Sequence, residues 1–412
     1  MKLAILGTRG VPPNYGGFET FAAELAVRLV QRGHDVSVYC REEGAAEWNG
    51  VHRIVVPSAK HKYFETVSHA FLSALDALRR DFDAILVCNA ANAFVLPLLR
   101  AARIPVAINV DGIERKRRKW NVFGRSVYSI GETFSVAFAN KVIADAEVIA
   151  DYYRANYAFA PTVIPYGSEF PQEGDSDVLE RLSLQPRNYV LYVSRFEPEN
   201  NPLEVLQAYN RLAVGGWRLA GEPPLASAGG PANRQPYSRL PVAGSRLAGE
   251  PPLAGVGGPA NRQPPTANPP LVMVGKGLYA HDLVNALHDR KTSNVLLPGA
   301  LYGRDYRTLQ RNALLYIQAT EVGGTHPAMI EAMASGGAVL AHDTPENREV
   351  GGDAVGYFAL RPAETLSGML QEWLSNPLIR EDFRARARKR AMERYSWESV
   401  TDAYEELFRN FL

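Results

Sequence analysis

Short apolar runs alternate along the chain with stretches in which apolar residues recur every three to four positions. Residues 2–8 form the first apolar run and end in a glycine-rich turn, and the helical period then covers residues 18–32. This pattern predicts a strand, a loop and a helix that stops at Gly33. Further strand-like runs occupy residues 36–39, 84–87, 106–109, 142–144 and 163–164.

A second series of apolar runs follows a junction near residues 166–185. These runs lie at residues 189–193, 271–274, 295–297, 315–317 and 338–341, with helical stretches between them. Strands separated by helices predict a parallel sheet with helices on both faces. We therefore predict an α/β protein with two Rossmann-like, doubly wound domains. Because open sheets of this kind bind ligands at the carboxyl ends of their strands, two of them predict a cleft between facing edges.

One segment, residues 214–270, departs from this pattern. The sequence at 218–236 is repeated almost unchanged at 246–264, and residues 215–270 contain 12 Pro and 10 Gly among 56 positions. Such a composition buries too little apolar area to offset the entropy lost on ordering, so we predict a disordered insert. It is either a proline-rich arm that binds a partner or a translated repetitive element without a role, and the composition favours the second interpretation.

The charge balance and the cysteines exclude several functional classes. The 45 basic and 44 acidic residues leave a net charge of +1, which argues against nucleic-acid binding. No apolar run reaches the roughly 18 residues of a membrane span, so we expect a cytoplasmic protein. Cys40 and Cys88 lie in strand-like runs without CxxC or Cys/His spacing, and this predicts buried thiols and no metal site.

Two loops that follow predicted strands are candidates for anion binding. Gly16 and Gly17 precede the first helix, whose amino end favours negative charge, although the loop lacks the GxGxxG fingerprint of dinucleotide-binding proteins. Arg195 follows the first strand of the second series and is able to clamp a phosphate. The alternatives are a plain turn for the glycines and a surface ion pair with Glu197 or Glu199 for Arg195.

The strongest chemical signal is the segment from Glu321 to Gly336. It follows a predicted strand, and Pro327 begins a helix directly after a flexible turn formed by Gly323, Gly324 and Thr325. The amides of this turn are suited to a diphosphate, and Glu331 is placed one turn further to accept hydrogen bonds from ribose hydroxyls. His326 either contacts phosphate or sugar or caps the helix.

These motifs together carry a family resemblance, which extends over the whole chain apart from the insert. The resembling segments are residues 5–20, 109–114 with Lys119 and Trp120, 164–167, 195–201 and 323–336. The chain resembles GT-B glycosyltransferases of family 4, in the glycogen-synthase-like superfamily, and within them the bacterial rhamnosyltransferase-like members. The resemblance implies an acceptor domain at residues 1–170, a nucleotide-sugar domain at 171–395, and a final helix at 396–412 that returns to the first domain.

The resemblance also implies a reaction and its site. The reaction is the transfer of a sugar, with rhamnose as the expected one, from a nucleoside diphosphate sugar with retention of configuration and without a metal or other cofactor. We expect catalytic roles for Asp111 and Glu321, although an Asx turn with Gly112 is the alternative for Asp111. Donor contacts are expected from Gly16, Gly17, Arg195, Lys276, Gly323, Gly324, Thr325, His326 and Glu331.

Two positions depart from the superfamily pattern. Position 200 is Asn where a Lys commonly follows the Arg by five residues, and Lys276 is the candidate replacement. The usual glutamate pair is eight residues apart, but Gly323 stands eight before Glu331, so Glu321 is either a displaced partner or a bystander.

A basic run bears on the acceptor. Arg115, Lys116, Arg117, Arg118 and Lys119 lie beside Trp120, a combination suited to an anionic membrane surface and to a lipid-linked or oligosaccharide acceptor. A solvated loop or phosphate contacts in the cleft are the alternatives. The alternatives for the whole protein are a nucleotide-sugar epimerase or hydrolase of the same fold, and a scaffold that binds the nucleotide sugar without catalysis.

Overall fold

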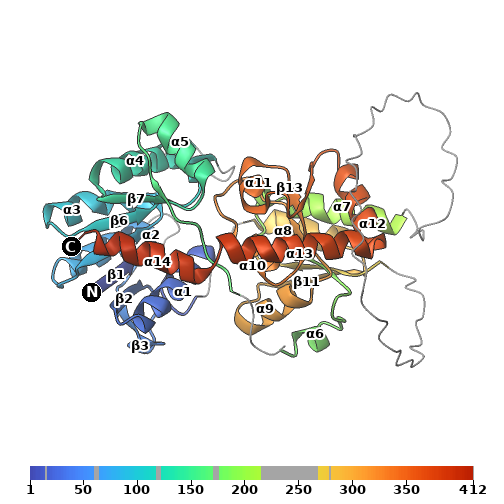
Figure 1. Ribbon diagram of the computed structural model, residues 1–412, viewed down its shortest axis with the longest axis horizontal. Coiled ribbons are helices and arrows are strands. Elements are labelled where there is room, and N and C mark those ends of the chain that lie inside the picture. The colour runs from blue at the N-terminus through green and yellow to red at the C-terminus, as the bar shows by residue number, and fades with distance from the viewer. Residues whose placement is uncertain are drawn as a thin grey trace, which may run out of the picture.

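The structure is a computed structural model that describes residues 1–13, 16–59, 65–116, 122–169, 176–214, 268–277 and 280–411. Two α/β domains lie side by side, each built on its own sheet (Figure 1). The predicted pair of Rossmann-like domains is therefore confirmed. The 214–270 insert lies outside the described residues apart from its ends, as do Arg117, Arg118 and Lys119 of the basic run.

The N-terminal sheet has the strand order β3-β4-β2-β1-β5-β6-β7-β8. Its strands are β1 Lys2–Leu6, β2 Asp35–Cys40, β3 Glu47–Trp48, β4 Val51–Val55, β5 Ala84–Cys88, β6 Val106–Asn109, β7 Lys141–Ala144 and β8 Thr162–Val163. All neighbours pair in parallel except β3 and β4. Asn49 and Gly50, which join these two strands, both have positive φ, as a tight hairpin turn requires.

The helices of this domain cover both faces of the sheet. They are α1 Gly17–Gln31, α2 Glu65–Ala77, η1 Ala90–Val95, α3 Leu96–Ala101, η2 Glu114–Lys116, α4 Val122–Phe138 and α5 Glu147–Tyr157. Helix α1 buries Phe21, Leu25 and Leu29 at the predicted spacing, which confirms the helix expected at 18–32. Cys40 and Cys88 are buried free thiols, as predicted.

The C-terminal sheet is parallel throughout, in the order β11-β10-β9-β12-β13-β14. Its strands are β9 Val190–Val193, β10 Leu271–Val274, β11 Val295–Gly299, β12 Leu315–Gln318, β13 Ala338–His342 and β14 Gly356–Phe358. Its helices are α6 Val178–Arg181, η3 Pro198–Asn200, α7 Pro202–Val214, α8 His281–Arg290, α9 Gly303–Asn312, α10 Pro327–Ala334, α11 Pro345–Gly351, α12 Glu364–Ser375 and α13 Pro377–Arg394.

The last helix, α14 Trp397–Arg409, crosses back and packs beside α1 of the N-terminal domain (Figure 1). The buried amide of Asn109 donates a 2.9 Å hydrogen bond to the hydroxyl of Tyr404. Where the chain crosses, the amide of Ser168 donates to the carbonyl of Tyr395 at 2.6 Å, and Ser168 forms a parallel bridge with Ser396. The two crossing segments therefore run side by side between the domains.

Candidate active site

The carboxyl edges of the two sheets meet at glycine-containing loops. Gly112 follows β6, and a Cβ added to it would lie only 2.9 Å from the Cα of Gly323, which follows β12. A Cβ added to Gly17 would lie 3.3 Å from the Cγ of Pro327, the first residue of α10. Small residues let these backbones approach closely, so the loop after β12 contacts the loops after β1 and β6.

The turn predicted to bind phosphate makes its bonds to a carboxylate of the other domain. The Thr325 amide donates to Oδ2 of Asp145 at 2.8 Å, and the Thr325 hydroxyl donates to the Asp145 carbonyl. A Cβ on Gly324 would overlap the same carboxylate, at 2.0 Å from Oδ1. Burial, followed by the charge of Asp111, raises the pKa of Asp145 well above its usual range.

Gly16 and Gly17 form the start of α1. Gly16 is the residue before the helix and has an extended backbone, and Gly17 is the first helical residue. Glu19, in the first turn, is buried and accepts a 3.1 Å hydrogen bond from the Arg9 amide. Burial raises the pKa of Glu19 even though this amide and the nearby arginines oppose the rise.

Glu331 lies on α10 with a tyrosine partner from α9. The hydroxyl of Tyr306 donates a short hydrogen bond to Oε2 of Glu331, and the side-chain amide of Gln310 donates to the same hydroxyl at 2.9 Å. Burial raises the pKa of Glu331 to about 7, while the bond from Tyr306 opposes the rise. This carboxyl is therefore held in one orientation and titrates near neutrality.

The two candidate cations lie on adjacent loops. The Phe196 amide, next to Arg195, donates to the Lys276 carbonyl at 3.1 Å. Nη1 of Arg195 lies 3.7 Å from Oε1 of Glu197, so the predicted alternative of an ion pair is present, and the Lys276 ammonium lies 5.8 Å from the ring centroid of Tyr302. Asn200, at the position of the missing Lys, is buried and donates to the Arg195 carbonyl at 2.7 Å, so it holds the loop.

The two residues predicted to be catalytic come from different domains. Asp111 follows β6 with a φ of 59°, its amide donates to Oδ1 of Asn109 at 3.0 Å, and its Oδ1 accepts a bond from Tyr166 at 3.3 Å. Glu321 lies two residues before Gly323 and donates its amide to the carbonyl of Glu199 at 2.9 Å. Both residues therefore lie on the loops at which the domains meet.

Solved structures with this fold cover the whole chain. Sucrose-phosphate synthase from Thermosynechococcus elongatus is 14% identical, with a TM-score of 0.74 over 99% of this chain and 98% of that one. HepE of Anabaena, solved with UDP-glucose, is 14% identical with a TM-score of 0.72 over 99% of both chains. WaaG, a glycosyltransferase involved in lipopolysaccharide biosynthesis, is 14% identical with a TM-score of 0.65 over 98% and 99%. A search of curated proteins found no match.

Family models match both domains. Residues 15–168 match the model described as Glycosyltransferase Family 4, and residues 261–390 match the model described as Glycosyl transferases group 1. The chain is a GT-B glycosyltransferase. The predicted fold and enzyme class are confirmed, whereas the rhamnosyltransferase-like subgroup stays a prediction.

The site of the glycosyltransferase includes residues that sequence reasoning missed. Asp145 directly follows β7, so its position at a strand end was an available signal. Tyr306 and Glu349 offered none, because their partners are distant in sequence. The carboxylate of Glu349 accepts bonds of 2.6 and 2.9 Å from the amides of Glu147 and Val148, and so caps α5 of the opposite domain.

The structure bears on the helix-capping role considered for His326 and on the membrane contact considered for Arg115. His326 is the residue before α10, but its side chain makes no capping hydrogen bond, and its ring lies against Gly323. Arg115 was expected at a membrane surface, but its Nε lies 3.5 Å from the buried carboxylate of Glu132, and its guanidinium lies over the ring of Tyr152. This charge is paired with Glu132 while the Arg115 side chain stays 35% exposed, so the membrane contact expected of Arg115 stays a prediction.

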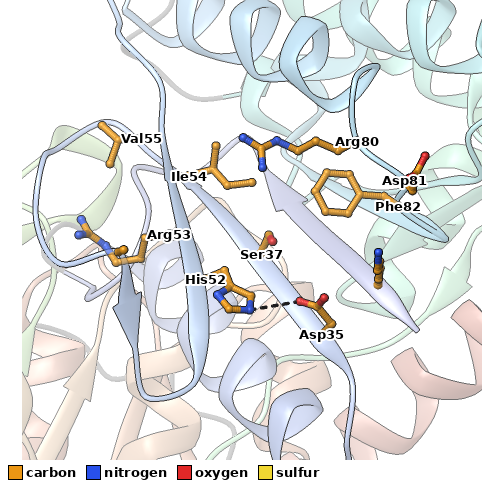
Figure 2. Close-up of a pocket in the computed structure, with 11 residues that line it drawn as sticks. Asp35, Ser37, His52, Arg53, Ile54, Val55, Arg80, Asp81 and Phe82 are labelled. Carbon is orange, nitrogen blue, oxygen red and sulfur yellow. Dashed lines mark ion pairs between the residues drawn. The ribbon is translucent and has the colours of Figure 1, made fainter.

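A hollow of about 520 Å³ lies elsewhere on the glycosyltransferase, over the N-terminal sheet and away from its carboxyl edge (Figure 2). His52 and Asp35 form an ion pair in it at 3.5 Å. None of the predicted site residues lines this hollow.

Among the described residues, no helix has both the length and the apolar character of a membrane span, and no group of three or more His, Cys, Asp or Glu has the arrangement of a metal site.

Proposed function

We propose that this glycosyltransferase moves a sugar from a nucleoside diphosphate sugar, with retention of configuration, to a lipid-linked or oligosaccharide acceptor in the synthesis of a cell-surface polysaccharide. Rhamnose is the sugar that the subgroup resemblance suggests, and the proposed reaction uses no cofactor or metal. The observation that carries the proposal is the meeting of the loop at 323–326 with the loops at Gly17 and Gly112. Each side comes from a domain that matches a glycosyltransferase model.

The C-terminal domain is proposed to hold the donor. The amino end of α10, the turn before it, Arg195 and Lys276 supply positive charge for the diphosphate that leaves during transfer. The Thr325 amide already bonds to the carboxylate of Asp145, and an amide that binds one oxyanion is suited to another. HepE has been solved with UDP and with UDP-glucose, which supports a nucleotide-sugar site in this fold.

Glu331 and Tyr306 are proposed to bind the ribose. A carboxylate accepts two hydroxyl hydrogen bonds well, and Tyr306 leaves one carboxylate oxygen of Glu331 for the ligand. Asp111 and Glu321, on opposite sides, are proposed to hold hydroxyls of the donor sugar or of the acceptor. When the domains close on both substrates, water is excluded and transfer is favoured over hydrolysis.

A membrane surface is proposed as the place of the acceptor. Helix α2 exposes Val67, Phe71, Leu72 and Leu75, and α4 exposes Val127 and Ile130, each by 36–55% of its surface. Helix α4 follows the basic run at 115–119 in the sequence, and apolar side chains together with basic ones suit an anionic lipid surface. We propose peripheral binding through α2 and α4.

The first test is thermal stabilisation against a panel of nucleoside diphosphates and their sugars, since a ligand of the native state raises the melting temperature. We expect a shift with one nucleoside diphosphate and a larger one with its sugar. Folded protein that responds to none of them would favour the scaffold interpretation, and donor turnover without an acceptor would favour a hydrolase or epimerase.

The site assignment is tested by Arg195→Ala and Glu331→Ala. Each variant should lose transfer activity by about tenfold or more, because each removes a polar contact to the donor. Arg361→Ala, an exposed arginine that pairs with Glu204 at 3.6 Å, is the matched control and should retain activity. Unchanged kinetics in both site variants would contradict the proposed placement of the donor.

Membrane binding is tested by flotation with vesicles that contain an anionic lipid. Phe71→Ser together with Leu75→Ser should reduce the bound fraction by about tenfold. Leu378→Ser is the control, because Leu378 is 82% exposed but lies on α13 of the other domain. Equal loss in both proteins would contradict a role for α2.

A further inference from the structure

The buried face of helix α2 carries polar side chains among its alanines, while several large apolar side chains of the helix face outward. Glu65, His69 and Ser73 recur every four residues, and His69 and Ser73 are fully buried. Neither the ring nitrogens of His69 nor the hydroxyl of Ser73 makes a hydrogen bond of ordinary geometry among the described residues. Buried polar groups of this kind call for a functional reason.

Two arginines from neighbouring strands converge on the start of this helix. Nη2 of Arg9, in the loop after β1, lies 3.4 Å from one oxygen of Glu65, and Nη1 of Arg41, directly after β2, lies 3.2 Å from the other. The Arg41 amide donates to the Arg9 carbonyl at 3.0 Å, which fixes the two residues side by side. A single carboxylate therefore bridges two guanidinium groups.

The cluster retains capacity for a further oxyanion. The side chain of Arg41 is only 8% exposed, and its Nε has no partner among the described residues. Burial, then the charge of Arg41, lowers the pKa of His69 to about 4, so the imidazole is neutral at physiological pH and does not compete for an anion as a second carboxylate would. The amino end of α2 adds its partial positive charge to that of the two arginines.

The location of this cluster is on the acceptor side of the site. Strands β2, β1, β5 and β6 are consecutive neighbours, so Arg41, Arg9 and Asp111 lie along one carboxyl edge of the N-terminal sheet. Glu19 on α1 connects this cluster to the interdomain contact, because its carboxylate accepts from the Arg9 amide and Gly17 of the same helix faces Pro327. The Gly323–Thr325 turn contacts the same edge at Gly112 and Asp145.

We propose that Arg9 and Arg41 bind an anionic group, a phosphate or a carboxylate, carried by the acceptor. The proposal rests on the proposed function, because that function makes this edge the acceptor side. Glu65 holds the two guanidinium groups in place when the acceptor is absent. When the acceptor binds, the Glu65 carboxylate moves aside for the acceptor's oxyanion. The enzyme therefore prefers an acidic acceptor over a neutral one of the same size.

The test measures binding directly, so it does not depend on transfer. Phenyl phosphate, phenyl glucuronide and neutral phenyl glucoside are titrated calorimetrically in the presence of saturating nucleoside diphosphate, which blocks the donor site. At least one anionic probe should bind about tenfold more tightly than the glucoside, and the phosphate and carboxylate arms identify which anion is preferred. Equal affinity for all three probes would overturn the proposal.

Variants that move affinity in opposite directions separate the proposal from a folding defect. Arg41→Gln and Arg9→Gln should abolish the preference for the anion, whereas Glu65→Gln should raise the affinity for it about threefold or more, because the internal carboxylate no longer competes. Arg80→Gln, at the far end of α2 where Arg80 pairs with Asp76 at 2.6 Å, is the control. If Glu65→Gln weakens binding of the anionic probe as much as the arginine variants do, the cluster has a structural role only and the proposal fails.

A variant of the donor site distinguishes probe binding at the arginine cluster from probe binding at the diphosphate contacts. Loss of phenyl phosphate binding in Arg195→Gln, with Arg41→Gln unaffected, would place the probe among the diphosphate contacts and overturn the proposal. Failure of the proposed function itself has a different signature, namely no thermal shift with any nucleoside diphosphate while the anion preference persists.

Discussion

In the C-terminal domain the close backbone contacts with the other domain come from one contiguous segment, residues 323–327, whereas the facing edge of the N-terminal sheet collects its groups from several elements. This segment contributes the Thr325 amide, and Glu331 on the helix that follows has a neutral tyrosine partner. The N-terminal edge carries paired charges, such as Arg41 with Glu65. One edge is thus organised by local chain geometry and the other by contacts between residues far apart in sequence.

This difference indicates a division of labour. A loop of fixed backbone groups is suited to a ligand part that never changes, such as a diphosphate. Paired side-chain charges are readily altered one at a time, and they suit a partner that differs between enzymes, as acceptors do. The comparison is open to test by substitutions on each side.

Gly324→Ala should have the largest effect, because it separates the two edges. An added methyl group overlaps the carboxylate of Asp145, so the domains cannot make their present contact. We expect transfer activity to fall about 100-fold, since misplacement of about 1 Å has that scale. Gly368→Ala, on α12 with open space around its Cβ position, is the control. Steady-state kinetics and small-angle scattering measure the loss and the separation, and full activity in Gly324→Ala would mean that the contact is dispensable.

Two acids with raised pKa, one from each edge, are compared by Glu331→Gln and Glu19→Gln. Because the pKa of Glu331 is raised in the folded protein to about 7 from 4.5, the folded state binds more protons than the unfolded state between these values. Stability therefore falls as the pH rises through this window, and Glu331→Gln should be more stable than the wild type by about 2 kcal/mol above pH 7. The gain should vanish at low pH.

For Glu19, the Arg9 amide and the arginines offset part of the burial effect, so Glu19→Gln should show a smaller gain. Denaturant unfolding at several pH values gives both differences. A larger gain for Glu19→Gln would reverse the comparison.

Tyr306→Phe tests the neutral partner on the C-terminal edge. Without the tyrosine hydroxyl, the pKa of Glu331 should rise further, because that bond lowers it. Nucleoside diphosphate should then bind about threefold to tenfold more weakly at neutral pH, with recovery at alkaline pH where the carboxyl ionises again. A loss that is the same at every pH would indicate a change in packing.

Tyr404→Phe should have the smallest effect and belongs to the N-terminal edge. It leaves the buried amide of Asn109 without this partner, which costs about 1 kcal/mol of unfolding free energy. A double-mutant cycle with Asn109→Ala isolates the pair. A coupling energy near zero would show that α14 is held by its other contacts.

Local signals predicted the C-terminal edge better than the N-terminal one. The alternation of strands and helices specified both sheets, and the Gly-Gly-Thr-His-Pro sequence located the turn before α10 because every group in it is adjacent in the chain. For Asp145 the sequence offered only its place at a strand end, and the roles of Glu349 and of the Arg9–Arg41–Glu65 cluster emerge only from folding. Their partners lie on other strands or on the other domain, and no spacing along the sequence records them.

The paired crossing of the chain at Ser168 and Ser396 limits how the two domains move. Gly167 packs directly against the ring of Trp397, and the backbone bridge beside it opposes sliding of one segment past the other. Two adjacent backbone connections permit rotation of one domain against the other about their common line, but they oppose sliding and separation of the domains. The domains should therefore open as rigid bodies about an axis near Ser168. Distances measured between pairs of probes across the two edges should then all follow from a single hinge angle.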